Sequence, residues 1–163
     1  GVIPTHDGAV VRTVDAMAPL HQRVVAIVDG DAEGLGYAAA LTAAGSPNSG
    51  VIIRWADGQM LEDTLGWIID ADAAACLAAI HIDNPAAATA DLVACLKSEN
   101  RNTGGLKKDT SSYESIAAAI GANEPCCARA CSLLNAIADL GKGVANPMFV
   151  ADANNAAIKV FQP

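Results

Sequence analysis

Apolar residues in the first part of the chain follow two spacings that alternate along the sequence. Continuous apolar runs rich in β-branched residues are typical of strands buried on both faces of a parallel sheet. Apolar residues that recur every three or four positions are typical of one face of a helix. The runs predict strands at residues 2–4, 24–28, 51–55 and 158–161, and the helical spacing predicts helices at residues 9–20, 32–44 and 60–69. Strands and helices in this order predict βαβ units and a parallel sheet, which is an α/β fold.

Between residues 70 and 140 the sequence is rich in alanine and its apolar spacing is helical. The predicted helices cover residues 73–80, 85–97, 111–120 and 125–140. The second of these is expected to begin at Asn84-Pro85, because proline is favoured at the first helical position. We therefore expect an α/β core over residues 1–70, an alanine-rich helical insertion or subdomain with a lysine-bearing loop over residues 71–145, and a C-terminal segment with a last strand over residues 146–163.

Two aspartates, Asp29 and Asp31, directly follow the predicted strand at residues 24–28. Parallel sheets place their ligands at the carboxyl ends of strands, and Gly30 between the two acids permits a sharp turn. Two carboxylates at this spacing suit Mg²⁺ or Mn²⁺, which prefer oxygen ligands. The alternative is structural: Asp29 starts a turn, and Asp31 caps the helix that begins at Ala32.

Composition limits the classes of function. The chain has 163 residues, of which 52% are hydrophobic and only 4% aromatic, so one domain with tightly packed small side chains is expected. Its net charge of −8 is unlike that of a stand-alone DNA-binding domain. Either the chain does not meet nucleic acid, or its acidity gathers at a metal site while another part of a larger protein holds the DNA. No apolar run is long enough to cross a bilayer, and no signal peptide is visible.

The five cysteines are an odd number in a chain without a secretion signal, which predicts free thiols in a reducing cytoplasm. Cys127 and Cys131 are four residues apart on a predicted helix, and Cys126 is adjacent. A zinc site would need a fourth ligand and usually a CxxC spacing. We interpret these cysteines as small apolar residues on a helix face.

Residues 24–34, VVAIVDGDAEG, resemble the DxD motif of Toprim domains, and most of all the Toprim region of the OLD (overcoming lysogenization defect) family of ATP-dependent endonucleases. Residues 59–65 are similar to the acidic helix of that family, and residues 106–117 to its lysine-bearing stretch. The resemblance covers roughly residues 1–140, and the DxD segment is its sharpest part. One departure is that Toprim sites also use a glutamate on the first strand, whereas residues 1–28 contain none. We expect this glutamate upstream of Gly1, since the chain lacks an initiator methionine.

The resemblance implies a Toprim (Rossmann-like) parallel sheet flanked by helices, and a metal-dependent DNA endonuclease that nicks or cleaves phosphodiester bonds with two Mg²⁺ or Mn²⁺ ions. Asp29, Asp31 and Glu62 would hold metal, and Lys107 or Lys108 would stabilise charge on the phosphate. The expected partners are DNA and an N-terminal ATPase domain of the same chain. That domain lies outside this sequence, which has no GxxxxGK[ST] motif. Homo-oligomerisation through the missing part is also expected.

Other interpretations stay open. A haloacid-dehalogenase-like phosphatase also places DxD after an apolar strand, but Gly-Thr would follow the second Asp, where this chain has Ala32-Glu33-Gly34. A degenerate Toprim domain would serve as a scaffold without catalysis. Glu62 could favour the dipole of its helix instead of binding metal. The two lysines could belong to a solvated loop or contact DNA phosphates without taking part in the chemistry.

Overall fold

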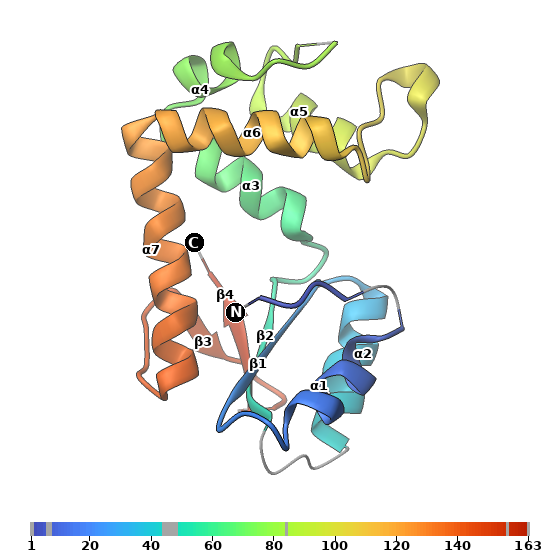
Figure 1. Cartoon of the computed structure of the whole chain (residues 1–163), viewed down its shortest axis with the longest axis vertical. Helices are drawn as coiled ribbons and strands as arrows, with labels where there is room; N and C mark the ends of the chain where they lie inside the picture. The colour runs from blue at the N-terminus through green and yellow to red at the C-terminus, as the bar shows by residue number, and fades with distance from the viewer. Residues whose placement is uncertain (1, 6–7, 44–48, 84, 156, 163) are drawn as a thin grey trace. The chain divides into compact units, whose positions relative to one another are not determined.

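The computed structural model describes residues 2–5, 8–43, 49–83, 85–155 and 157–162 (Figure 1). Contacts between residues divide the chain into two compact units. The first, here called the sheet unit, comprises Gly1–Met60 and Asn135–Pro163. The second, here called the helical unit, comprises Leu61–Leu134. The long helix α7 (Glu124–Lys142) begins in the helical unit and ends in the sheet unit.

The sheet unit contains a four-stranded mixed sheet. Its strands are β1 (Val24–Val28), β2 (Ser49–Arg54), β3 (Phe149–Ala151) and β4 (Ile158–Phe161), in the spatial order β1-β2-β4-β3. The pairs β1–β2 and β2–β4 are parallel, whereas β3 runs antiparallel to β4. The predicted α/β class is therefore confirmed, with a mostly parallel sheet and one antiparallel edge strand that the sequence pattern did not predict.

Two helices, α1 (Val10–Met17) and α2 (Ala32–Ala43), pack on one face of this sheet (Figure 1). Alternate residues of a strand point to the same face, and residues three or four apart share one face of a helix. Both periodicities place apolar side chains in one cluster. Its buried members are Val10, Val14, Ala26, Val28, Ala38, Leu41, Ile52 and Ile158. The cluster fixes β1 against α2, and so fixes the turn that joins them.

The other face of the sheet carries aromatic residues. Phe161 of β4 lies between two rings: its centroid is 5.3 Å from that of Trp55 in an edge-on arrangement and 5.5 Å from that of Phe149. These three side chains are buried. Near β1, Arg23 donates a hydrogen bond of 3.2 Å to the carbonyl of Gly141 in α7. The end of α7 is thereby fastened to the beginning of β1.

The helical unit contains α3 (Leu61–Ile69), α4 (Ala73–Ala79), α5 (Thr89–Lys97), a short 3₁₀ turn η1 (Arg101–Thr103), α6 (Thr110–Ala122) and the first part of α7. Helix α3 packs against α5, and α4 packs against α6. Gly66 lets α3 and α5 approach closely, because a Cβ at this position would lie 2.7 Å from a methyl group of Val93. The alanine-rich segment is therefore helical, as its spacing predicts.

One predicted strand and the predicted start of one helix are wrong. Residues 2–4 form no strand, and Val2 and Ile3 are exposed. A run of three apolar residues forms a strand only if another strand pairs with it, and none does among the described residues. Helix α5 begins at Thr89 instead of Pro85, since Ala88 before it has an extended backbone. Asn84, the predicted start signal, lies outside the described residues. None of the helices in the described ranges is long and apolar enough to cross a membrane.

Candidate functional site

The turn between β1 and α2, which carries Asp29 and Asp31, is bound to the loop that follows β2. The backbone N–H of Gly30 donates to the carbonyl of Gln59 at 2.7 Å, and the N–H of Gly58 donates to the carbonyl of Gly30 at 2.9 Å. Since β1 and β2 are neighbouring parallel strands, both segments lie at carboxyl ends of the sheet. This is the edge at which open α/β sheets bind ligands.

Two glycines make this arrangement possible. A Cβ at Gly30 would lie 1.8 Å from the backbone oxygen of Ala56, and a Cβ at Gly34 would lie 2.0 Å from the backbone oxygen of Asp29. Any other residue at either position would collide with backbone, which cannot move aside as a flexible side chain can. The first turn of α2 therefore lies directly on the backbone of Asp29. The position of the two aspartates is set by close packing on both sides of the turn.

Asp31 caps helix α2. Its Oδ1 atom accepts a hydrogen bond of 2.8 Å from the backbone N–H of Gly34, and its carbonyl accepts the N–H of Leu35 at 2.9 Å. This is the geometry of an N-cap, so the structural alternative considered for Asp31 is confirmed. Capping uses one carboxylate oxygen of Asp31, and a carboxylate has a second. Both Asp29 and Asp31 are half-buried, and Asp29 is itself engaged in an interaction within the protein.

A third acidic residue of the same segment is held by a tyrosine. The hydroxyl of Tyr37 donates to the carboxylate of Glu33 one helical turn earlier, and it accepts the backbone N–H of Gly8 at 2.7 Å. Tyr37 thus links α2 to Gly8, two residues before α1. Glu33 is engaged in this link, so it serves the packing of the N-terminal segment.

A buried arginine lies at the end of β2. Arg54 pairs with Asp152 at 2.8 Å and with Asp57, and only 6% of its side chain is exposed. Burial opposes the charge of Arg54, but the hydrogen bonds to Asp152 and Asp57 outweigh it and raise its pKa. The same contact with Arg54 lowers the pKa of Asp152. Two carboxylates neutralise this guanidinium, so it holds loops together and is not presented to a phosphate.

In the helical unit, the first turn of α3 is held by its neighbours. Glu62 is buried and its Oε1 accepts a hydrogen bond of 3.2 Å from the hydroxyl of Tyr113 in α6. Burial and the nearby charge of Glu62 raise the pKa of Tyr113 to about 12. The adjacent Asp63 pairs with Lys97 of α5 at 2.6 Å. Within this unit, Glu62 therefore connects α3 to α6.

The two predicted lysines lie on the loop before α6. Both are near Glu99, with Nζ–Oε1 distances of 3.9 Å for Lys107 and 3.5 Å for Lys108. Lys108 has a φ of 63°, which is unusual for a residue other than glycine. The side chain of Lys108 is 72% exposed and that of Lys107 33%. Of the two, Lys108 is therefore the more accessible to a charged ligand.

This loop has a defined internal structure. Arg101 donates to the carbonyls of Gly105 at 2.8 Å and Lys107 at 3.1 Å. Asp109 caps α6 by accepting the backbone N–H of Ser112 at 3.0 Å, and hydrogen bonds from Ser112 and Ser111 lower the pKa of Asp109. The loop therefore holds Lys107 and Lys108 on an ordered backbone.

The predicted site residues fall into two groups. Asp29 and Asp31 share one turn of the sheet unit, whereas Glu62, Lys107 and Lys108 belong to the helical unit. Across the described ranges, no group of three or more His, Cys, Asp or Glu side chains is arranged to hold a metal ion. The two aspartates of the DxD segment lie in one turn after β1, and the two lysines lie together beside Glu99.

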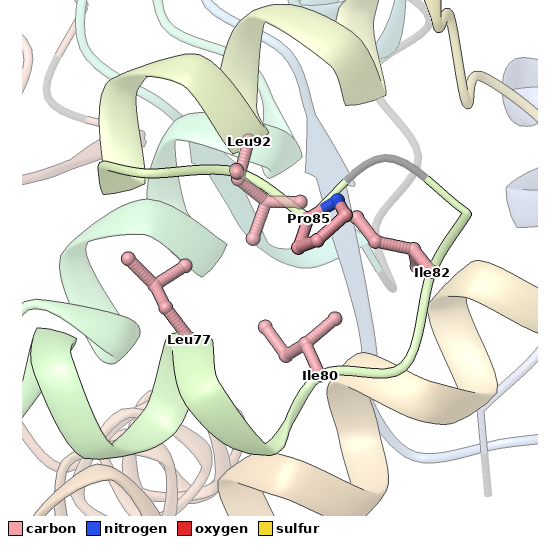
Figure 2. A pocket seen from close by; sticks show the side chains of 6 residues that line it. Leu77, Ile80, Ile82, Pro85 and Leu92 are labelled. Atoms are coloured by element: carbon pink, nitrogen blue, oxygen red, sulfur yellow. The ribbon is translucent and has the colours of Figure 1, made fainter.

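A shallow apolar hollow in the helical unit is unrelated to these groups. Figure 2 shows five of the side chains that line it. Leu77 belongs to α4, Ile80 follows the last residue of α4, and Leu92 belongs to α5. Ile82 and Pro85 lie in the connection between α4 and α5. Ala86 completes the lining. All six side chains are apolar, so the hollow offers no group for acid–base or metal chemistry.

No protein-family model matches this chain, and no curated protein or solved structure matches it either. Function must therefore be inferred from the residues themselves and their surroundings.

Proposed function

We propose that this chain is the catalytic region of a Mg²⁺- or Mn²⁺-dependent DNA endonuclease with a Toprim-like sheet. The observation that supports this most directly is the turn after β1. There, Asp29 and Asp31 stand at the carboxyl end of a parallel strand, and close packing at Gly30 and Gly34 fixes them. A tightly packed turn holds the residues that it carries in a defined position, as binding and catalytic sites require.

The two aspartates fit a hard divalent cation by their donor chemistry. Mg²⁺ in nucleotide-processing sites is commonly held by one or two carboxylates, with waters and phosphate oxygens as its other ligands. Oδ1 of Asp31 is used by the Gly34 N–H, which leaves Oδ2 as the donor on this residue. A backbone amide that holds one oxygen also orients the other, as outer hydrogen bonds do for metal ligands in general.

When bound, divalent ions at such carboxylates lower the pKa of an attacking water and neutralise charge on the phosphate. The resemblance to OLD-family nucleases implies two such ions, with Glu62 as a further ligand. Glu62 accepts a hydrogen bond from Tyr113, so only its remaining oxygen positions are available for this role. We propose Asp29 and Asp31 as the main metal ligands and Glu62 as an additional one.

The lysine loop suits contact with a phosphate. The ammonium group of Lys108 is largely exposed, and its pairing with Glu99 at 3.5 Å is of the solvent-exposed kind that contributes little. An anionic phosphate can therefore compete for it. In this proposal Lys107 or Lys108 stabilises the charge that develops on the phosphate.

DNA, an ATPase domain of the same protein and a homo-oligomer are the proposed partners, all by resemblance. The net charge of −8 agrees with a catalytic region whose DNA contacts are made largely by other parts of the protein.

A scaffold without catalysis is the second candidate. Two contacts favour it: Asp31 caps α2, and Glu62 accepts a hydrogen bond from Tyr113. Both acids therefore have a structural role that requires no metal. A phosphatase of the haloacid-dehalogenase type would use the same two aspartates with a phosphate monoester as substrate.

Plasmid cleavage by the intact protein separates these candidates. A nuclease converts supercoiled plasmid to nicked or linear DNA with Mg²⁺ or Mn²⁺, and loses at least about 100-fold in rate in Asp29→Asn. The matched control is Asp15→Asn, at an exposed acid of α1. Cleavage of p-nitrophenyl phosphate without plasmid cleavage would instead favour the phosphatase, and inactivity on both would favour the scaffold.

A further inference from the structure

Helix α7 carries three cysteines whose surroundings differ. Cys126 is buried, Cys127 is half-buried and Cys131 is exposed. Cys126 belongs to the core, where its thiol donates to the carbonyl of Ile69 at 3.5 Å. All three lie on a helix, as predicted, but only Cys126 is buried. Cys127 and Cys131 lie outside that core.

Cys127 and Cys131 face the same side of α7. Residues four apart on a helix are neighbours, with Cβ atoms about 5–6 Å from each other. The two thiols interact: the hydrogen bond of the Cys127 thiol to Cys131 and repulsion between the two thiolates raise the pKa of Cys127. They therefore form a pair at the surface of the helical unit.

A disulfide between these two residues would strain the helix. A disulfide requires Cβ atoms about 3.5–4.5 Å apart, which is closer than helical neighbours at this spacing stand. The structure accordingly contains both as free thiols. Zinc does not fit either, because a structural zinc site uses four ligands, and the described part of the chain has no group of three or more His, Cys, Asp or Glu that could hold a metal.

We propose that Cys127 and Cys131 bind one Cu⁺ ion through their two sulfur atoms. Thiolates are soft ligands that select Cu⁺ over hard cations. Cu⁺ also accepts a coordination number of two, which matches the number of sulfur ligands at this place. Binding replaces the two thiol protons: Cu⁺ and two thiols give a bis-thiolate complex of charge −1 and two protons, with no change of oxidation state.

The proposed copper site uses sulfur donors and the turn of Asp29 and Asp31 offers oxygen donors, and soft and hard donors select different metals. Its chemistry does not depend on the proposed nuclease activity. If the chain binds Cu⁺ at α7 but cleaves no DNA, the copper proposal holds and the nuclease proposal fails. If it cleaves DNA but does not bind Cu⁺, the nuclease proposal holds and the copper proposal fails.

Anaerobic competition with the Cu⁺ chelator bathocuproine disulfonate tests the proposal. We expect one equivalent of Cu⁺ per chain to be withdrawn from the chelator, and at least tenfold weaker binding in Cys127→Ser and in Cys131→Ser. The matched control is Cys95→Ser, at a half-buried cysteine of α5, which should bind as the unmodified chain does. Circular dichroism of each variant verifies that α7 is folded. Wild-type affinity in Cys131→Ser, an equal loss in Cys95→Ser, or no withdrawal from the chelator would each overturn the proposal.

Discussion

Oδ1 of Asp31 accepts the backbone N–H of Gly34 at 2.8 Å, so one candidate metal ligand is also the N-cap of helix α2. The two roles are compatible, because the cap uses one oxygen of the carboxylate. They also have different requirements, since an amide side chain can cap a helix but is a much poorer ligand for Mg²⁺ than a carboxylate. Substitution of Asp31 can therefore separate the structural role from the metal-binding role.

The first prediction concerns the cap. Asp31→Ala removes the acceptor for the Gly34 N–H and should lower the free energy of unfolding by about 1 kcal/mol. Asp31→Asn keeps an oxygen acceptor at the same place, so it should lower the free energy of unfolding by only a few tenths of the loss caused by Asp31→Ala. Urea denaturation followed by circular dichroism measures both. Equal stability of the alanine and asparagine variants would show that the cap contributes nothing.

The second prediction concerns close packing at the turn. Gly30→Ala places a methyl group 1.8 Å from the backbone oxygen of Ala56, and the backbone must shift to admit it. We expect a loss of about 1–3 kcal/mol in the free energy of unfolding, typical of overpacked positions.

The matched control is Gly36→Ala in α2, the helix that follows this turn, where an added Cβ has no atom within 4 Å. Alanine is favoured over glycine inside a helix, so this variant should gain about 0.5–1 kcal/mol. A similar effect of both substitutions would contradict the packing of Gly30 against Ala56.

The third prediction concerns the buried pair of Arg54 and Asp152. Asp152→Asn removes a hydrogen bond between charged groups and should lower the free energy of unfolding by about 2 kcal/mol at pH 7. Asp57 still pairs with Arg54 in this variant, which limits the loss.

The effect of Asp152 depends on pH in a defined direction. Its pKa in the folded chain lies below the ordinary value of 3.8, so its contribution is present above that pH and is lost as the pH falls further. The difference in stability between the unmodified chain and Asp152→Asn should therefore shrink as the pH falls from 5 towards 3. A difference that stays constant over this range would remove the ion pair as its cause.

The fourth prediction concerns Tyr113. Spectrophotometric titration at alkaline pH should show one tyrosine that ionises at about 12, and Tyr113→Phe should remove this component. The chain has two tyrosines, so the difference spectrum isolates one of them. Tyr113→Phe also leaves buried Glu62 without this donor, which should cost about 1–3 kcal/mol. Ionisation of Tyr113 near the ordinary value of 10 would contradict its burial beside Glu62.

Local patterns in the sequence were sufficient for most of the fold. The β-branched run at Val24–Val28 forms β1 with the predicted bounds, because a strand buried in a parallel sheet leaves a continuous apolar signal. Strand β3 leaves no such signal: it has three residues, of which Phe149 is buried and the next two are exposed. Its place at the sheet edge is decided by pairing with β4, and not by its own residues.

In the candidate site, too, some features could be predicted from local sequence and others could not. Asp29 and Asp31 could be found from their position after a strand. The partners of Arg54 and Glu62 could not, since Asp152 is 98 residues from Arg54 and Tyr113 is 51 residues from Glu62. Such pairs arise from the packing of distant segments. An arginine within an apolar strand, as in Ile53-Arg54-Trp55, was the signal that could have indicated an acidic partner, because a charge buried in a sheet must be paired.

Calorimetric titration with Mn²⁺ tests the central claim most directly, that Asp29 and Asp31 hold a divalent cation. The unmodified protein should bind Mn²⁺ with measurable heat, and Asp29→Asn and Asp31→Asn should each weaken binding at least tenfold while circular dichroism shows an intact fold. Asp15→Asn should bind as the unmodified protein does. Unchanged binding of Mn²⁺ in both Asp29→Asn and Asp31→Asn would contradict the account.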